Sequence, residues 1–295
     1  MHRGVLLVGA LALAACGPSV AGSAGAGSSA EPAAAPGQPA AKRGSGPAIV
    51  YGAQPSRTLV LHRMDSVTFE LPGGGQQVQA FGRTAYLTVG LSRGQASGFR
   101  ALVVLDSIRA DSGQLMPLPI DSLRAAEGTR WTADIAPTGK LSNIQASDST
   151  TVAAQIGGTL QQLFPVLPAG GARPGAQWTD TSHTKITAGT LTTDLTSANS
   201  YNATGYVQQG STQALEITNQ ATTTQNGSGT QFGQAIQVSG NGTSHATYRL
   251  AEDGTLVHAE GADNTKLTLT VPAVGQTVPV VQTGSFTITV PATAP

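Results

Sequence analysis

The stretch "RTAYLTVGL", residues 83–91, alternates between polar and apolar side chains over its whole length. Its apolar members share one side of an extended chain: Ala85, Leu87, Val89 and Leu91. Successive side chains of a β-strand point to opposite faces, so this pattern predicts a strand with one face buried and one face in water.

The same period of two recurs in both directions along the chain. It is found in four further stretches: "VTFEL" (67–71), "HATYRL" (245–250), "KLTLTV" (266–271) and "SFTITV" (285–290). Turn-forming residues fall between or beside such runs: "LPGGG" (71–75), "PTGK" (137–140), "QNGSG" (225–229), "GNG" (240–242) and "EDG" (252–254). We expect each of these to close a hairpin of an antiparallel sheet.

Helical periodicity is confined to a short part of the sequence. In "STTVAAQIGGTLQQLF" (149–164), apolar residues recur at helical spacing: Val152, Ile156, Leu160 and Leu163. Asp148 or Ser149 is expected to cap the start of this helix and Pro165 to end it, while the Gly157–Gly158 pair would let it lie close to a sheet. A shorter helical turn is expected in "PIDSLRAAEG" (119–128).

These patterns predict a mainly β fold in which a curved antiparallel sheet carries one packed helix. The β-rich region runs from residue 48 to residue 295. Two segments, 129–148 and 244–263, align without gaps at an offset of 115 residues. A division into two similar lobes, 48–147 and 166–295, joined by the helix, is therefore an alternative to a single domain.

The amino-acid composition argues against a nucleic-acid partner. Charged residues form 11% of the chain and the formal net charge is zero, against about 25% charged residues in an average protein. A nucleic-acid groove needs clustered lysine and arginine, so no nucleic-acid partner is expected.

The first residues have the properties of an export signal. His2 and Arg3 precede the uncharged run "GVLLVGALALAA" (4–15), which is shorter than the roughly 20 residues that cross a bilayer as a helix. We therefore predict a signal peptide over residues 1–15. Residues 16–47 are nearly all Gly, Ala, Ser and Pro, a composition typical of a disordered tether.

Leu13, Ala14 and Ala15 stand directly before Cys16, the single cysteine of the chain. This sequence resembles the lipobox of bacterial lipoproteins. The resemblance implies cleavage between Ala15 and Cys16, a lipid attached to the Cys16 sulfur, acyl chains such as palmitate, and a membrane partner reached through the anchor. Gly17 is not the aspartate that marks inner-membrane retention in the family, which implies the outer membrane, facing the periplasm.

No pattern in the body of the chain indicates catalysis. The chain has no GxSxG elbow and no HExxH zinc motif, and neither a catalytic, a cofactor nor a metal-binding residue is predicted. The most suggestive pair is His258 with Glu260, which share one face of a strand and are expected to be a solvated polar pair. Trp131 and Trp178 are expected to serve packing.

The function that these observations favour is a non-enzymatic binding or scaffold module of the cell envelope, with an envelope protein as partner. Two alternatives stay open. One is a carrier of a lipid or other apolar ligand, because the outline of sheet and helix is similar to LolA-like and LppX-like carriers; Ile156, Leu160 and Leu163 would then face the ligand. The other is a hydrolase with an unrecognised site.

Overall fold

The structure is a computed structural model, which describes residues 46–70, 74–94, 98–111, 120–148, 150–188, 190–231 and 233–291. Ala15, Cys16 and the tether up to residue 45 lie outside the described residues. The lipidation and cleavage predictions therefore rest on the sequence alone.

Eleven strands and a few short helical segments make up the described chain. The strands are β1 (Gln54–Glu70), β2 (Gln76–Arg93), β3 (Phe99–Ala110), β4 (Arg130–Ile135), β5 (Leu141–Ala146), β6 (Gln177–Ala188), β7 (Leu191–Gln209), β8 (Thr212–Gln231), β9 (Gln234–Leu250), β10 (Leu256–Val271) and β11 (Gln276–Thr289). The helices are α1 (Ile120–Ala125) and α2 (Thr151–Gly157), and the 3₁₀ turns are η1 (Leu160–Leu163) and η2 (Pro272–Val274).

All strands belong to one antiparallel sheet. Its order is β5-β4-β3-β2-β1-β11-β10-β9-β8-β7-β6, so the first and last strands are neighbours at its centre, in a register that pairs Leu61 with Ile288. The mainly β fold predicted from the alternating stretches is confirmed. Segments 48–147 and 166–295 both contribute to this sheet and meet at the β1–β11 pair. β5 and β6 form its two open edges.

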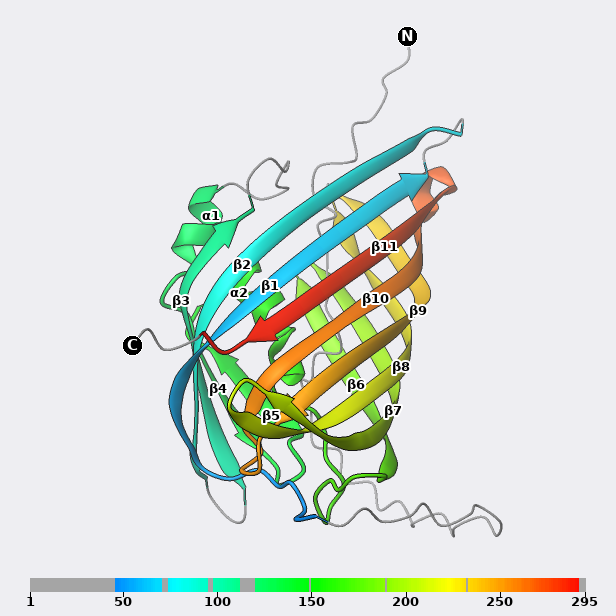
Figure 1. The fold of residues 1–295 in the computed structure, drawn as a ribbon. Helices are drawn as coiled ribbons and strands as arrows, with labels where there is room; N and C mark the ends of the chain where they lie inside the picture. The colour runs from blue at the N-terminus through cyan, green and yellow to red at the C-terminus, as the bar shows by residue number, and fades with distance from the viewer. Residues whose placement is uncertain are drawn as a thin grey trace, which may run out of the picture.

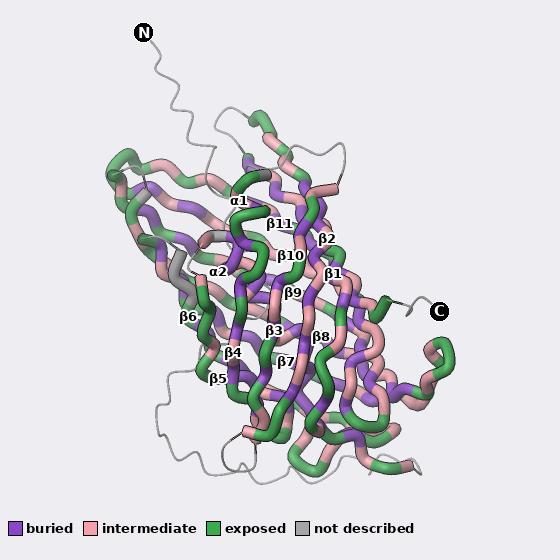
Figure 2. Tube along the Cα trace, turned by 90° about the vertical axis from the view of Figure 1, so that its left-hand side faces the viewer, coloured by how far each residue is buried: buried purple, intermediate pink, exposed green. Residues whose placement is uncertain are grey.

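The sheet curves strongly, and α2 lies inside the curve (Figure 1). We call the face toward α2 the inner face. Along the strands, buried residues alternate with exposed or partly exposed ones (Figure 2), as the period of two predicts. Leu87 and Leu105 on the inner face join Ile156 of α2 and Trp131 of β4 in one apolar core.

The helix is shorter than the sequence predicts. It begins with Thr150 as its cap, whose hydroxyl accepts a hydrogen bond from the Ala153 N–H at 3.2 Å, so neither expected cap is correct. The Asp148 carboxylate instead accepts from the Thr150 N–H; Ser149 lies outside the described residues. After Gly157 the chain tightens into η1. A Cβ atom at Gly157 would lie 3.0 Å from Trp131 Nε1, so glycine allows the close approach to the sheet.

Two of the predicted turns are wrong. "QNGSG" and "GNG" lie inside β8 and β9, whereas "PTGK" and "EDG" do close hairpins, with Gly139 and Gly254 at φ 85° and 77°. "LPGGG" lies between β1 and β2, and residues 71–73 of it are outside the described part. The strand glycines have a packing role: a Cβ at Gly242 would lie 2.6 Å from Thr265 Oγ1 on the next strand.

The short turn expected near residue 120 is confirmed as α1. It follows β3 and precedes β4, where Leu123 and Ala126 are buried in the same core as Trp131. α1 thus packs beside β3, on the half of the sheet formed by β1–β5.

Candidate functional site

A band of polar side chains crosses the inner face between two apolar regions. The strand register sets Tyr201 of β7 beside Asn219 of β8, and Asn219 beside Ala246 of β9. Two rows further along the strands, the register sets Gln282 of β11 beside Thr265 of β10. Apolar residues lie beyond this band on one side, around Val67, Phe69 and Val280, and on the other in the core near α2.

A cavity lies over this band. It is lined by β6–β11 on one side and by residues 161–166 on the other, and it contains about 1020 Å³ of space not filled by atoms, including solvent at its mouth. Its walls combine the rings of Tyr201, Tyr248 and Phe286 with amide and hydroxyl groups.

Three buried amide groups of the lining have no hydrogen-bond partner within the described chain. They are the Nδ2 atom of Asn219, the Nε2 atom of Gln282 and the Oε1 atom of Gln162. These residues are only 7%, 3% and 7% exposed. Buried polar atoms are almost always satisfied, and leaving one unsatisfied costs about 1–3 kcal/mol. The cavity therefore presents donors and an acceptor that something else must satisfy.

The charges of the lining are compensated. Lys140 Nζ lies 3.4 Å from Asp180 Oδ1, and Asp263 Oδ1 lies 3.1 Å from Arg63 Nη2. Arg63 also holds Asp65 through contacts of 2.8–3.1 Å, in a buried network at the centre of β1. Burial raises the pKa of Asp263, an effect that Arg63 opposes. The site thus has polar walls without an unpaired excess of either charge.

The aromatic lining groups stay neutral. Burial raises the pKa of Tyr201 and of Tyr248 above the ordinary tyrosine value, so both hydroxyls keep their protons under physiological conditions. Tyr201 stacks on Trp178 with ring centroids 5.3 Å apart and planes 7° apart. The stack fixes the Tyr201 ring at one end of the cavity.

The segment from η1 to residue 167 covers the cavity and bonds to both edges of the sheet. Toward β5, Gln161 accepts from the Leu141 N–H at 3.1 Å. Toward β6, Trp178 Nε1 donates to the Val166 carbonyl at 2.8 Å. The Tyr51 hydroxyl donates to the Pro165 carbonyl at 2.7 Å. These bonds hold the cover across the gap between the edge strands.

The helix residues named from the sequence lie beside this cavity rather than on its walls. Ile156, Leu160 and Leu163 are 2%, 2% and 3% exposed and pack in the apolar core. From this part of the chain, the cavity is lined instead by Gln161, Gln162, Pro165 and Val166. Trp131 is buried in that core, as expected of a packing residue.

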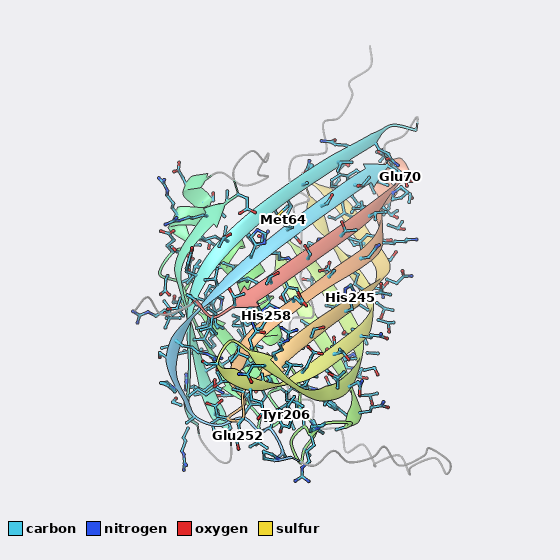
Figure 3. The ribbon with its side chains drawn as sticks, viewed as in Figure 1. Met64, Glu70, Tyr206, His245, Glu252 and His258 are labelled. Carbon is cyan, nitrogen blue, oxygen red and sulfur yellow. The ribbon has the colours of Figure 1, made fainter. Side chains whose placement is uncertain are left out.

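His258 and Glu260 do share one face of β10, with Nε2 and Oε2 3.8 Å apart. The register pairs Glu260 with Thr247 and Thr287, which places both residues on the outer face, away from the cavity. Figure 3 labels His258 and also His245, an exposed residue of β9. Within the described residues, no group of three or more His, Cys, Asp or Glu side chains is placed to hold a metal ion. No helix of the described part is long and apolar enough to span a membrane.

The cavity amides belong to no catalytic motif in the sequence. A weaker signal exists in the strand pattern. Gln282 occupies an inner-face position in the same alternation as Val280 and Phe286, and Asn219 follows Ile217 on the inner face of β8. An amide side chain at an inner-face position, where the alternation predicts an apolar residue, is the sequence feature that marks the site.

Comparisons with known proteins give no family. No family model matches the chain, and no curated protein matches it in sequence. One solved structure, described as "Asymmetric conductivity of engineered proteins", is similar at a TM-score of 0.25 and 8% identity, over 79% of this chain and 100% of that one. A likeness at this level does not bear on fold or function.

Proposed function

We propose that this chain is a non-enzymatic binding module, held at the bacterial cell envelope by a lipid on Cys16. The observation that supports binding is the cavity under residues 161–166, with three buried amide atoms whose hydrogen bonds the described chain does not satisfy. The lipobox-like sequence before Cys16 supports the anchor. A periplasmic location on the outer membrane belongs to the same proposal.

The carrier of an apolar ligand is the weaker alternative, because the apolar side of α2 packs in the core. The hydrolase alternative has one observation in its favour, since the carboxylates of Asp180 and Asp263 both line the cavity. Each of them has a cation as ion-pair partner. These ion pairs support a role in charge balance.

The test is native mass spectrometry of the full chain, purified in mild detergent from membranes of a bacterium that processes it. We expect a reproducible non-covalent mass that solvent extraction releases. The variant Ser244→Phe places a ring in the cavity and should abolish the extra mass. The matched variant Ser200→Phe puts the same ring on the exposed side of β7 and should retain it. An extra mass that both variants retain would reject the cavity as a binding site, and so would the lack of both an extra mass and binding of an added ligand.

A further inference from the structure

The cavity walls carry information about the chemistry of the ligand. We infer that the cavity binds an uncharged, sugar-like molecule that carries hydroxyl and amide groups, and that Asn219, Gln282 and Gln162 are its hydrogen-bonding residues. This inference rests on the proposed binding function. It selects one class of ligand over the fatty acid that an apolar carrier would hold.

The buried amides specify both kinds of hydrogen-bonding group. Asn219 Nδ2 and Gln282 Nε2 are donors and require acceptors, whereas Gln162 Oε1 is an acceptor and requires a donor. They come from β8, β11 and η1, and so they approach a ligand from the sheet and from the cover. A hydroxyl group donates and accepts at once, and an amide group offers both functions, so a molecule bearing these groups satisfies all three atoms.

Charge excludes the acidic ligands. The cations near the cavity, Lys140 and Arg63, are each bound to a carboxylate, at 3.4 Å for Asp180 and 3.1 Å for Asp263. A fatty acid or a phosphate would bring a negative charge to these carboxylates and find no cation that is not already paired with one. Burying such a charge without a partner is strongly unfavourable.

Aromatic rings of the cavity wall would supply the apolar contacts to the ligand. Phe286 and Tyr248 line the cavity, and Tyr201 is held rigid by its stack on Trp178. Water molecules alone would satisfy the amides but have no apolar surface to place against these rings. Sugar-like molecules have polar edges and apolar C–H faces, which match walls that alternate between amides and aromatic rings.

Two threonines on the strands either side of Gly242 add hydroxyl groups to the cavity wall. Gly242 faces inward between Thr223 and Thr265, and a Cβ atom on it would lie 2.8 Å and 2.6 Å from their hydroxyl oxygens. Any larger residue would displace these hydroxyls. Both threonines line the cavity and extend the hydrogen-bonding surface beyond the amides.

The experiment uses N-acetylglucosamine as the uncharged probe and decanoate as the apolar acid, each titrated into the full processed chain and followed by saturation-transfer NMR. We expect N-acetylglucosamine to bind and decanoate not to compete. Asn219→Leu and Gln282→Met, which keep side-chain volume and remove the donors, should each weaken binding at least tenfold. Gln220→Leu changes the next residue of β8, which is exposed on the outer face, and should leave binding unchanged.

Circular dichroism of each variant separates lost binding from lost folding, and Gln282→Met serves where Asn219→Leu does not fold. Binding that both cavity variants retain would overturn the inference. Binding of decanoate in place of the sugar would also overturn it while leaving the proposed function intact. Where neither probe binds, the composition of the co-purified mass decides: a neutral molecule with hydroxyl and amide groups supports the inference, and an apolar or charged one overturns it. The lack of both a bound probe and a co-purified mass would reject the proposed function as well.

Discussion

Arg63 and Asp263 form an ion pair with Nη2 and Oδ1 3.1 Å apart, although their strands, β1 and β10, are separated by β11. The intervening position is Gly284, which the register aligns with Asp65 on one side and Asp263 on the other. A Cβ atom there would lie 2.7 Å from Arg63 Nη2. The pair therefore exists because the middle strand has no side chain at this point.

Gly284→Ala should lower the free energy of unfolding by about 1–3 kcal/mol, because the added methyl group forces the Arg63 guanidinium away from Asp263. Urea unfolding measures the change. Gly170→Ala is the matched control, since its Cβ would meet no atom within 4 Å; it should stay within about 0.5 kcal/mol of the parent chain. Equal effects at the two positions would contradict the steric role of Gly284.

The raised pKa of Asp263 predicts a pH dependence of stability. Burial disfavours the charged carboxylate in the folded state, so the folded protein holds this proton more tightly than the unfolded chain does. The stability that this carboxyl group contributes is therefore fully present below its pKa in the unfolded state, about 3.9. It is lost as pH rises through the higher pKa of the folded state. The unfolding free energy of the parent chain minus that of Asp263→Asn should fall as pH rises from about 4 toward neutrality. A difference that rises with pH would contradict the direction of the shift.

Leu160→Ala should destabilise the fold by about 2–5 kcal/mol, because it opens a hole in a core where Leu160 is 2% exposed. Thermal unfolding measures the loss. Val78→Ala removes an apolar side chain that is 61% exposed and should change little. A Leu160→Ala chain of unchanged stability that loses its bound mass would instead assign Leu160 to the ligand.

Cys16→Ser should abolish incorporation of radiolabelled palmitate and move the chain from the membrane to the soluble fraction of the exporting cell, because no other cysteine exists to carry the lipid. Metabolic labelling followed by fractionation provides the measurement. Ser19→Ala, three residues further on, should label as the parent does. Label retained by Cys16→Ser would reject the lipoprotein proposal.

Much of the architecture could be predicted from local pattern. The alternation around Leu87 predicted a strand with one buried face, and the glycines of "PTGK" and "EDG" predicted hairpins that the structure contains. The same reasoning placed turns at "QNGSG" and "GNG", which are strand interiors. Glycine serves both a turn and a close approach between neighbouring strands, and only the neighbouring strands show which role applies.

The sequence by itself determined the class of fold, because side-chain alternation is a property of a single strand. Tertiary structure decided which strands are neighbours, and with them the cavity. The pairing of β1 with β11 brings Arg63 near Asp263, 200 residues apart in the sequence, and the curve of the sheet gathers Asn219, Gln282 and Gln162 around one space. Such contacts depend on which strands pair, in what register, and on how the sheet curves. The alternation of side chains along a single strand specifies none of these.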